Sequence, residues 1–170
     1  SLGARGKQTP RVTGQYDFGI PLPLNHSSIW VRSGFTVVEG SANSSISKSY
    51  LGGFGNNYVD NAANGGAQRY RDLYSMPGFE IGALRGKTLV KTTVEWSLPP
   101  IRFENFGTPG AYASWIRPVI FASYLVTDLQ DSARRDNAAA LGVQFDMQLQ
   151  VMHRLPMMFS LGFARGFGGS

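Results

Sequence analysis

The strongest constraint on the fold is a regular two-residue alternation of apolar and polar side chains in residues 88–98. A period of two puts alternate side chains on opposite faces of a strand. A second stretch, residues 141–151, repeats the pattern. The faces of the first stretch are Val90, Thr92, Val94, Trp96 and Leu98 against Leu89, Lys91, Thr93, Glu95 and Ser97. Those of the second are Leu141, Val143, Phe145, Met147, Leu149 and Val151 against Gly142, Gln144, Asp146, Gln148 and Gln150.

Composition also favours strands over helices. The 170 residues include 21 Gly and 12% aromatic residues but only 16% charged residues, and no long run of helix-forming residues occurs at helical spacing. No apolar run reaches the roughly 18 residues that a transmembrane helix needs. The absence of cysteine excludes disulfides and cysteine-based zinc sites. Residues 1–7 do not resemble a signal peptide, so we expect a mature chain or a fragment.

The alternation and the turn residues together predict one β-barrel region over residues 1–170. We expect an irregular long loop at residues 40–85 and a turn at residues 99–110. Pro118 cannot donate to a ladder, so its strand should bend, bulge or lie at an edge there. The expected strands lie near 10–20, 28–39, 88–98, 111–127, 138–152 and 157–167.

The character of the two faces favours a membrane barrel. Transmembrane barrel strands alternate lipid-facing apolar residues with polar residues toward the lumen, and their extracellular loops are long. The predicted lipid-facing residues are Val90, Val94, Trp96, Leu141, Val143, Phe145, Leu149, Phe159, Leu161 and Phe163. The predicted lumen-facing residues are Lys91, Glu95, Gln144, Asp146 and Gln148.

Two stretches also resemble a known superfamily. GALRGKTLVKTTVEWSLPP, with Gly86, Glu95, Trp96 and Pro99, and GVQFDMQLQVMHRLPMMFSLGFARGF resemble the barrels of bacterial surface antigens, outer-membrane protein assembly and two-partner secretion. The resemblance covers about Met76 to Phe167. It implies that Pro77, Gly78 and Phe79 form the tip of the long loop.

The chain departs from that superfamily at two places. Pro77 stands where the loop tip usually carries Arg, and Phe121, Ala122 and Ser123 stand where a Phe-x-Asp partner is usual. A buried charge without its partner is costly. We therefore expect both halves of the superfamily's lumenal salt bridge to be absent together, which argues against docking of the loop by that pair.

The resemblance implies a transmembrane antiparallel barrel larger than this chain. We expect a fragment of about six strands from a barrel of about 16, with unpaired edges at 10–20 and 157–167. A rival count adds strands at 46–54 and 79–84 and gives a closed barrel of about eight strands. We favour the fragment because those two runs are short and interrupted by glycine.

Three functions follow from these expectations. The first is an outer-membrane conduit or an insertion or secretion barrel in a Gram-negative bacterium. The second is a barrel that anchors soluble domains outside this chain, and the third is a soluble ligand-binding barrel or sandwich. The expected partners are outer-membrane lipid or detergent, the remaining strands or domains of a larger protein, and polypeptide substrates. The net charge is +5, and Lys and Arg are spread singly along the chain, with Arg69, Arg71 and the Arg134–Arg135 pair as the only local concentrations. No basic helix or motif organises them, so nucleic acid is not expected.

Catalysis has little support in the sequence. His26 and His153 lie in separate turns with no acidic residue at ligand spacing. The acidic residues Asp128, Asp131 and Asp136 lack the glycine and terminal glutamate of a calcium loop. We therefore expect no enzyme activity, no metal site and no cofactor.

Overall fold

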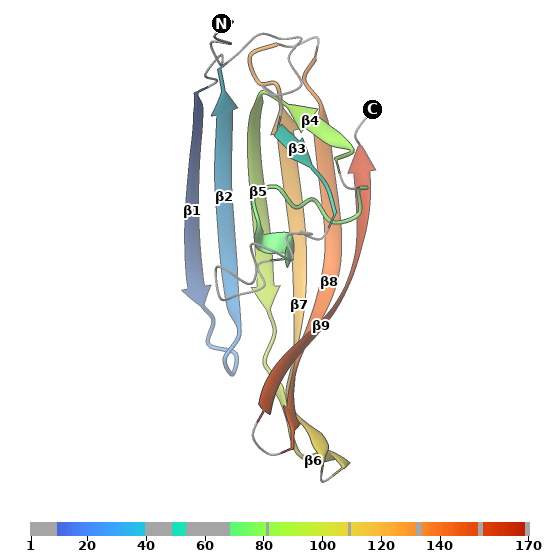
Figure 1. Ribbon diagram of the computed structural model, residues 1–170. Coiled ribbons are helices and arrows are strands. Elements are labelled where there is room, and N and C mark those ends of the chain that lie inside the picture. Colours follow the sequence, from blue (N-terminus) through green and yellow to red (C-terminus); the bar gives the residue numbers. More distant parts are fainter. Residues whose placement is uncertain are drawn as a thin grey trace, which may run out of the picture.

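The protein is all-β and is built on one large antiparallel sheet, as the computed structural model shows (Figure 1). The structure describes residues 10–39, 49–53, 69–80, 82–108, 110–131, 134–152 and 155–168. The strand order is β1-β2-β5-β7-β8-β9, and every pair is antiparallel. The all-β prediction is therefore confirmed. These strands are β1 Arg11–Pro21, β2 Ser28–Val38, β5 Thr88–Ser97, β7 Ala111–Thr127, β8 Asn137–Val151 and β9 Leu155–Gly168.

The described sheet is open, with β1 and β9 as its two edges (Figure 1). Part of the long connection forms a separate two-stranded sheet of β3 (Ser49–Leu51) and β4 (Leu84–Gly86), and a single 3-10 turn, η2 (Arg69–Arg71). Neither β3 nor β4 joins the large sheet, so the alternative of a closed eight-stranded barrel is not what the described residues form. Residues 40–48, 54–68 and 81 of the predicted loop lie outside the described residues.

The predicted turn at residues 99–110 is wrong, because a further strand, β6 (Ile101–Thr108), forms there and pairs with the first residues of β7. Thus β5 and β6 lie one after the other along the same side of β7. The break between them is opposite Pro118, whose carbonyl oxygen accepts a hydrogen bond from the Leu98 amide. The missing N–H of Pro118 points to that same side, so the ladder between β7 and β8 loses nothing. The register irregularity in that ladder lies earlier, between Ala113 and Trp115.

The sheet has two unlike faces. The inner face, which residues 69–80, β3 and β4 cover, carries most of the buried polar side chains, and the outer face is left uncovered by the described chain (Figure 1). Nine of the ten residues that we predicted to face lipid are exposed on the outer face, and Leu149 is half-buried there. Of the residues that we predicted to face a lumen, Lys91, Glu95, Gln144 and Asp146 are buried on the inner face. Gln148 is half-buried on that face.

The register aligns outer-face residues in rows that run perpendicular to the strands. One row crosses all six strands as Ile20, Ile29, Trp96, Ile120, Val143 and Phe163. The next row, nearer the end of the sheet that holds the long connection, is Phe18, Val31, Val94, Ala122, Leu141 and Arg165. With these two rows, the positions at which the apolar residues begin and end can be compared between strands.

Candidate functional site

The candidate site is residues 69–80, here called the docked segment, together with the inner face that it covers. Figure 1 shows this segment, β3 and β4 in front of the central strands of the sheet. Backbone hydrogen bonds join the segment to β3 and the residues that follow it, from the Gly52 amide to the Tyr74 carbonyl and from the Met76 amide to the Gly53 carbonyl. The docked segment therefore sits on the sheet as part of a small layer with its own hydrogen bonds.

Lys91 organises the backbone of the docked segment. Its side chain is 3% exposed, and Nζ donates to the carbonyl oxygens of Tyr70, Asp72 and Ser75 at 3.2, 2.6 and 2.6 Å. An ammonium group has three protons, so these carbonyls use its whole donor capacity. The alternation of β5 fixes the direction of Lys91 toward the inner face, and the segment bends its carbonyls around that one cation.

Glu95, four residues further along β5, holds the second anchor of the docked segment. Its carboxylate is buried and accepts hydrogen bonds from Arg71 at 2.5 and 2.8 Å. Arg32 on β2 approaches the same carboxylate at 3.5 Å and also pairs with Asp17 on β1. A chain of ion pairs therefore runs from the edge strand β1 to the docked segment, and each buried charge has an opposite charge beside it.

Tyr70 packs beside this ion pair. Its ring stacks on Phe121 with 4.0 Å between ring centroids and an interplanar angle of 8°. Burial raises the pKa of the Tyr70 hydroxyl, and the negative charge of Glu95 raises it further. Burial alone would lower the pKa of Arg71, but the hydrogen bonds and charge of Glu95 outweigh it and raise that pKa. Tyr70 is therefore neutral and Arg71 charged at every physiological pH.

Apolar packing fixes the rest of the docked segment. Leu73 and Met76 are buried against Leu89 and Leu125 of the sheet, with Tyr74 and Phe79 partly buried beside them. Small side chains on β8, Ala138 and Ala140, form the floor of this cluster, which also includes Leu51 of β3 and Leu84 of β4. A floor of small residues lets the segment approach the sheet closely.

The predicted loop tip touches the edge strand β9. Pro77 is buried and Phe79 partly buried, while Gly78 has φ of +89°, a conformation that favours glycine. A Cβ at Gly78 would collide with the backbone of Arg165 and Gly166, and one at Gly166 would meet the ring of Phe79. Two glycines thus allow the tip and β9 to meet backbone to backbone.

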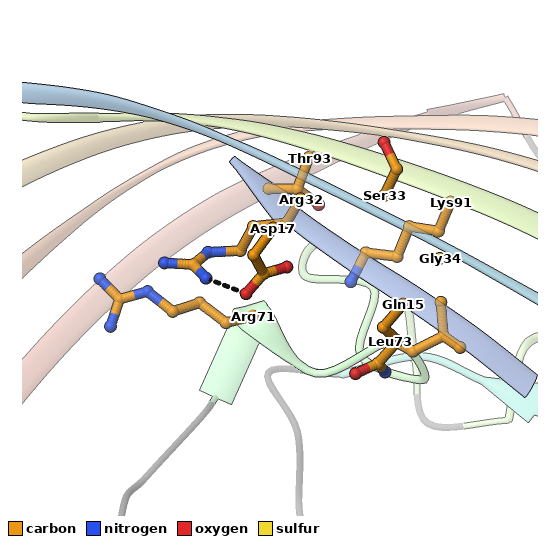
Figure 2. A pocket seen from close by; sticks show the side chains of 9 residues that line it. All are labelled: Gln15, Asp17, Arg32, Ser33, Gly34, Arg71, Leu73, Lys91 and Thr93. Carbon is orange, nitrogen blue, oxygen red and sulfur yellow. Dashed lines mark hydrogen bonds and ion pairs between the residues drawn. The ribbon is translucent and has the colours of Figure 1, made fainter. Parts of the chain in front are cut away.

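A polar cavity of about 170 Å³ lies between the docked segment and strands β1 and β2. Figure 2 shows the guanidinium groups of Arg32 and Arg71 on one side of Asp17 and the Lys91 side chain on the other. Its lining is Gln15, Asp17, Arg32, Ser33, Gly34, Arg71, Leu73, Lys91 and Thr93. The three cations of this lining already have partners, because Arg32 and Arg71 form ion pairs and Lys91 donates to backbone carbonyls. The cavity therefore does not present an unpaired cation to a ligand.

The sequence analysis located the receiving face but missed how the segment docks. We expected the loop not to dock on the sheet through the superfamily's charged pair, because Pro77 and Ser123 stand at its two positions, and we named no other pair between the loop and the sheet. A different pair, Arg71 and Glu95, joins them. A signal was present, since a glutamate on the inner face of a strand needs a cation and Arg71 belongs to one of the few local concentrations of basic residues in the chain.

The described residues offer no catalytic constellation. His26 lies in the turn between β1 and β2 with φ of 66°, and His153 is outside the described ranges. No group of three or more His, Cys, Asp or Glu in the described ranges could hold a metal ion. Nor does any helix in those ranges have the length and hydropathy to cross a membrane.

Comparison of this chain with protein-family models, with curated proteins and with solved structures finds no match.

Proposed function

We propose that this chain forms part of the wall of an outer-membrane β-barrel in a Gram-negative bacterium, with the outer face against lipid. The proposal includes membership of the surface-antigen and protein-assembly superfamily, on the residues quoted above. The observation that carries the proposal is the group of exposed apolar residues on the outer face, here called the apolar band. This band lies obliquely across the strands.

The apolar band has the length of a membrane span on both edge strands. On β1 it runs from Val12 to Ile20, and on β9 from Leu155 to Phe163, nine residues in each case. A tilted transmembrane strand needs about 9 to 11 residues. The longest strands, β7 with 17 residues and β8 with 15, include parts that lie outside the band.

The slope of the band supports membrane insertion more strongly than its length. Phe163, the end of the band on β9, shares a row with Ile20, the opposite end of the band on β1. The band therefore shifts by eight residues, roughly 26 Å, across five interstrand steps of roughly 4.8 Å each. The resulting angle is roughly 45°, similar to the strand tilt of transmembrane barrels. A soluble sheet has no reason to place its apolar face along such a diagonal.

Polar side chains are few within the band, and two of them pair with each other. The hydroxyls of Ser33 and Thr92, neighbours on β2 and β5, lie 3.2 Å apart and hydrogen-bond to each other. Such pairing is what a hydrocarbon environment requires of a polar side chain. A soluble protein, in contrast, rarely leaves an apolar surface of this extent uncovered.

On this proposal the inner face lines a lumen, and the docked segment closes the part of it near the long connection. Lys91, Glu95 and Arg71 hold the segment by charge, while the cluster around Met76 and Leu125 holds it by packing. The barrel then serves as a conduit or insertion device for polypeptides, and the docked segment blocks its lumen at rest.

A second candidate, a barrel that only anchors soluble domains, is favoured by the apolar packing of the docked segment. An anchor needs no open path. The docked segment buries Leu73 and Met76 in a cluster with six other hydrophobic residues, so it is costly to move.

Conductance of the full chain in planar bilayers separates the conduit from the anchor. Channels that appear when Arg71 is replaced by Met support the conduit, and a silent barrel in both forms supports the anchor.

The experiment that tests membrane insertion uses spin labels at neighbouring residues of β8 in the full chain, reconstituted in lipid vesicles. Phe145 is 42% exposed on the outer face near the middle of the band, and Gln144 is buried on the inner face. A lipid-soluble quencher should reach the label at position 145 and not the one at 144. Equal access to both would contradict the proposal.

A further inference from the structure

Arg165 is the one charged side chain on the outer face of β1, β2, β5, β7, β8 and β9 within their described residues. The other charged residues of these strands, such as Arg32 and Arg117, alternate toward the inner face. Arg165 is exposed, and none of the salt bridges found among the described residues includes it. An exposed cation with no ion pair among the described residues is available to an anionic group from outside the sheet.

The position of Arg165 within the oblique band identifies that partner. On β1, β2 and β5 its row holds Phe18, Val31 and Val94, which lie inside the apolar band. On β9 the same row is two residues beyond Phe163, where the band ends. Outward polar residues also stand at this end of two inner strands, Thr88 as the first residue of β5 and Asn137 as the first residue of β8. Arg165 therefore sits at the rim of the apolar face, at the end of the sheet that holds the long connection.

The surroundings of Arg165 suit an amphiphile. Its guanidinium carbon lies 5.6 Å from the centroid of the Phe167 ring, a cation–π contact that leaves its N–H groups able to donate elsewhere. Leu141 is its neighbour in the row, and Phe163 and Leu161 continue the apolar surface below it. A planar guanidinium is suited to bidentate binding of phosphate oxygens.

We propose that Arg165 binds the phosphate group of a membrane lipid whose acyl chains lie on Phe163 and Leu161. The inference rests on the proposed membrane function. In membrane barrels the longer loops face the outside of the cell, so the rim at Arg165 lies in the outer leaflet. There the phosphate-bearing lipid is lipopolysaccharide.

The test compares lipid retained by the full chain purified in mild detergent after incorporation into vesicles. One vesicle preparation contains lipopolysaccharide, and the other contains the same glycolipid after enzymatic removal of its phosphates. The unaltered chain should retain the phosphorylated form preferentially. The Arg165→Gln variant should lose that preference by roughly tenfold, as expected for loss of one charge-assisted, bidentate contact. Arg165→Lys should keep part of it, because the charge remains but the planar fork does not.

Arg135→Gln is the matched control, since Arg135 lies at the same end of the sheet, in the link between β7 and β8, and donates to the Leu129 carbonyl. That variant should retain lipid as the unaltered chain does. Equal retention by the unaltered chain and Arg165→Gln, with the label at Phe145 still reached by the lipid-soluble quencher, would overturn the phosphate site alone. A label at Phe145 that lies in water would overturn the membrane function and this site with it.

Discussion

Replacement of Lys91 by Met should release the docked segment and leave the sheet intact. The substitution keeps most of the aliphatic volume of the side chain but removes the donor shared by the carbonyls of Tyr70, Asp72 and Ser75. The Asp72 carbonyl keeps the amide and the hydroxyl of Ser75 as donors. The carbonyls of Tyr70 and Ser75 lose the donor that Lys91 supplied, which is costly unless the segment moves to let water reach them.

The size of the effect follows from the geometry. A hydrogen bond to a charged donor contributes about 1.5 to 3 kcal/mol, and two of the three bonds of Lys91 are short, at 2.6 Å. The sum is reduced because Met does not carry the desolvation cost of a buried ammonium group. We expect docking to weaken by about 2 to 4 kcal/mol, which corresponds to a loss of hydrogen-exchange protection of roughly 30- to 1,000-fold.

The assay is amide hydrogen exchange of the full chain in lipid or detergent. The reporters are the amides of Ser75, Met76 and Phe79, which donate within the docked segment or to Gly53. Amides in the ladder between β7 and β8 should stay protected, which separates undocking from unfolding. Lys87→Met serves as control, because it makes the same chemical change four residues away. Unchanged protection of Ser75 and Met76 in Lys91→Met would refute the reasoning.

Three further predictions concern the same segment. In a double-mutant cycle, Arg71→Met and Glu95→Gln should show a coupling of about 1 to 3 kcal/mol in the docking free energy, and additive effects would contradict the ion pair. Gly78→Ala should expose the Phe79 amide more than Gly82→Ala does, because both glycines have positive φ but only Gly78 would place a Cβ against backbone; equal effects would argue against the contact with β9. Because the pKa of Tyr70 is raised above its unfolded value of about 10, docking stability should be constant below that pH and fall as pH rises through the folded value. Tyrosinate absorbance should then show a late-titrating component that Tyr70→Phe removes, and titration of all tyrosines together would contradict it.

The strands could be predicted from sequence because their signal is local. An alternation such as Val90, Lys91, Thr92, Thr93 and Val94 defines a strand and its two faces without knowledge of its partners. The strand expected at 138–152 corresponds to β8, and the strand expected at 88–98 corresponds to β5. Short links and antiparallel pairing then place β1 beside β2 and put β7, β8 and β9 in order, whereas β2 and β5 pair across the long connection.

The strand β6 and the docked segment were missed because their signals are not local. Pro99 and Pro100 indicate a turn in the sequence. The residues after them form a strand because they pair with β7, beginning with Ile101 and Ile116. Likewise, nothing near Arg71 in the sequence specifies Glu95 as its partner. The slope of the apolar band was also invisible, since it depends on the register of all six strands.

The most direct test of the central claim measures depth in the bilayer along one row of the sheet. Spin labels at Ile20, Ile120 and Phe163 share a row perpendicular to the strands, and depth follows from the ratio of quenching by oxygen and by a water-soluble nickel complex. The oblique band predicts that Ile120 lies near the bilayer centre, while Ile20 and Phe163 lie near opposite surfaces. Equal depth at all three positions, or full access of all three to the water-soluble quencher, would contradict the account.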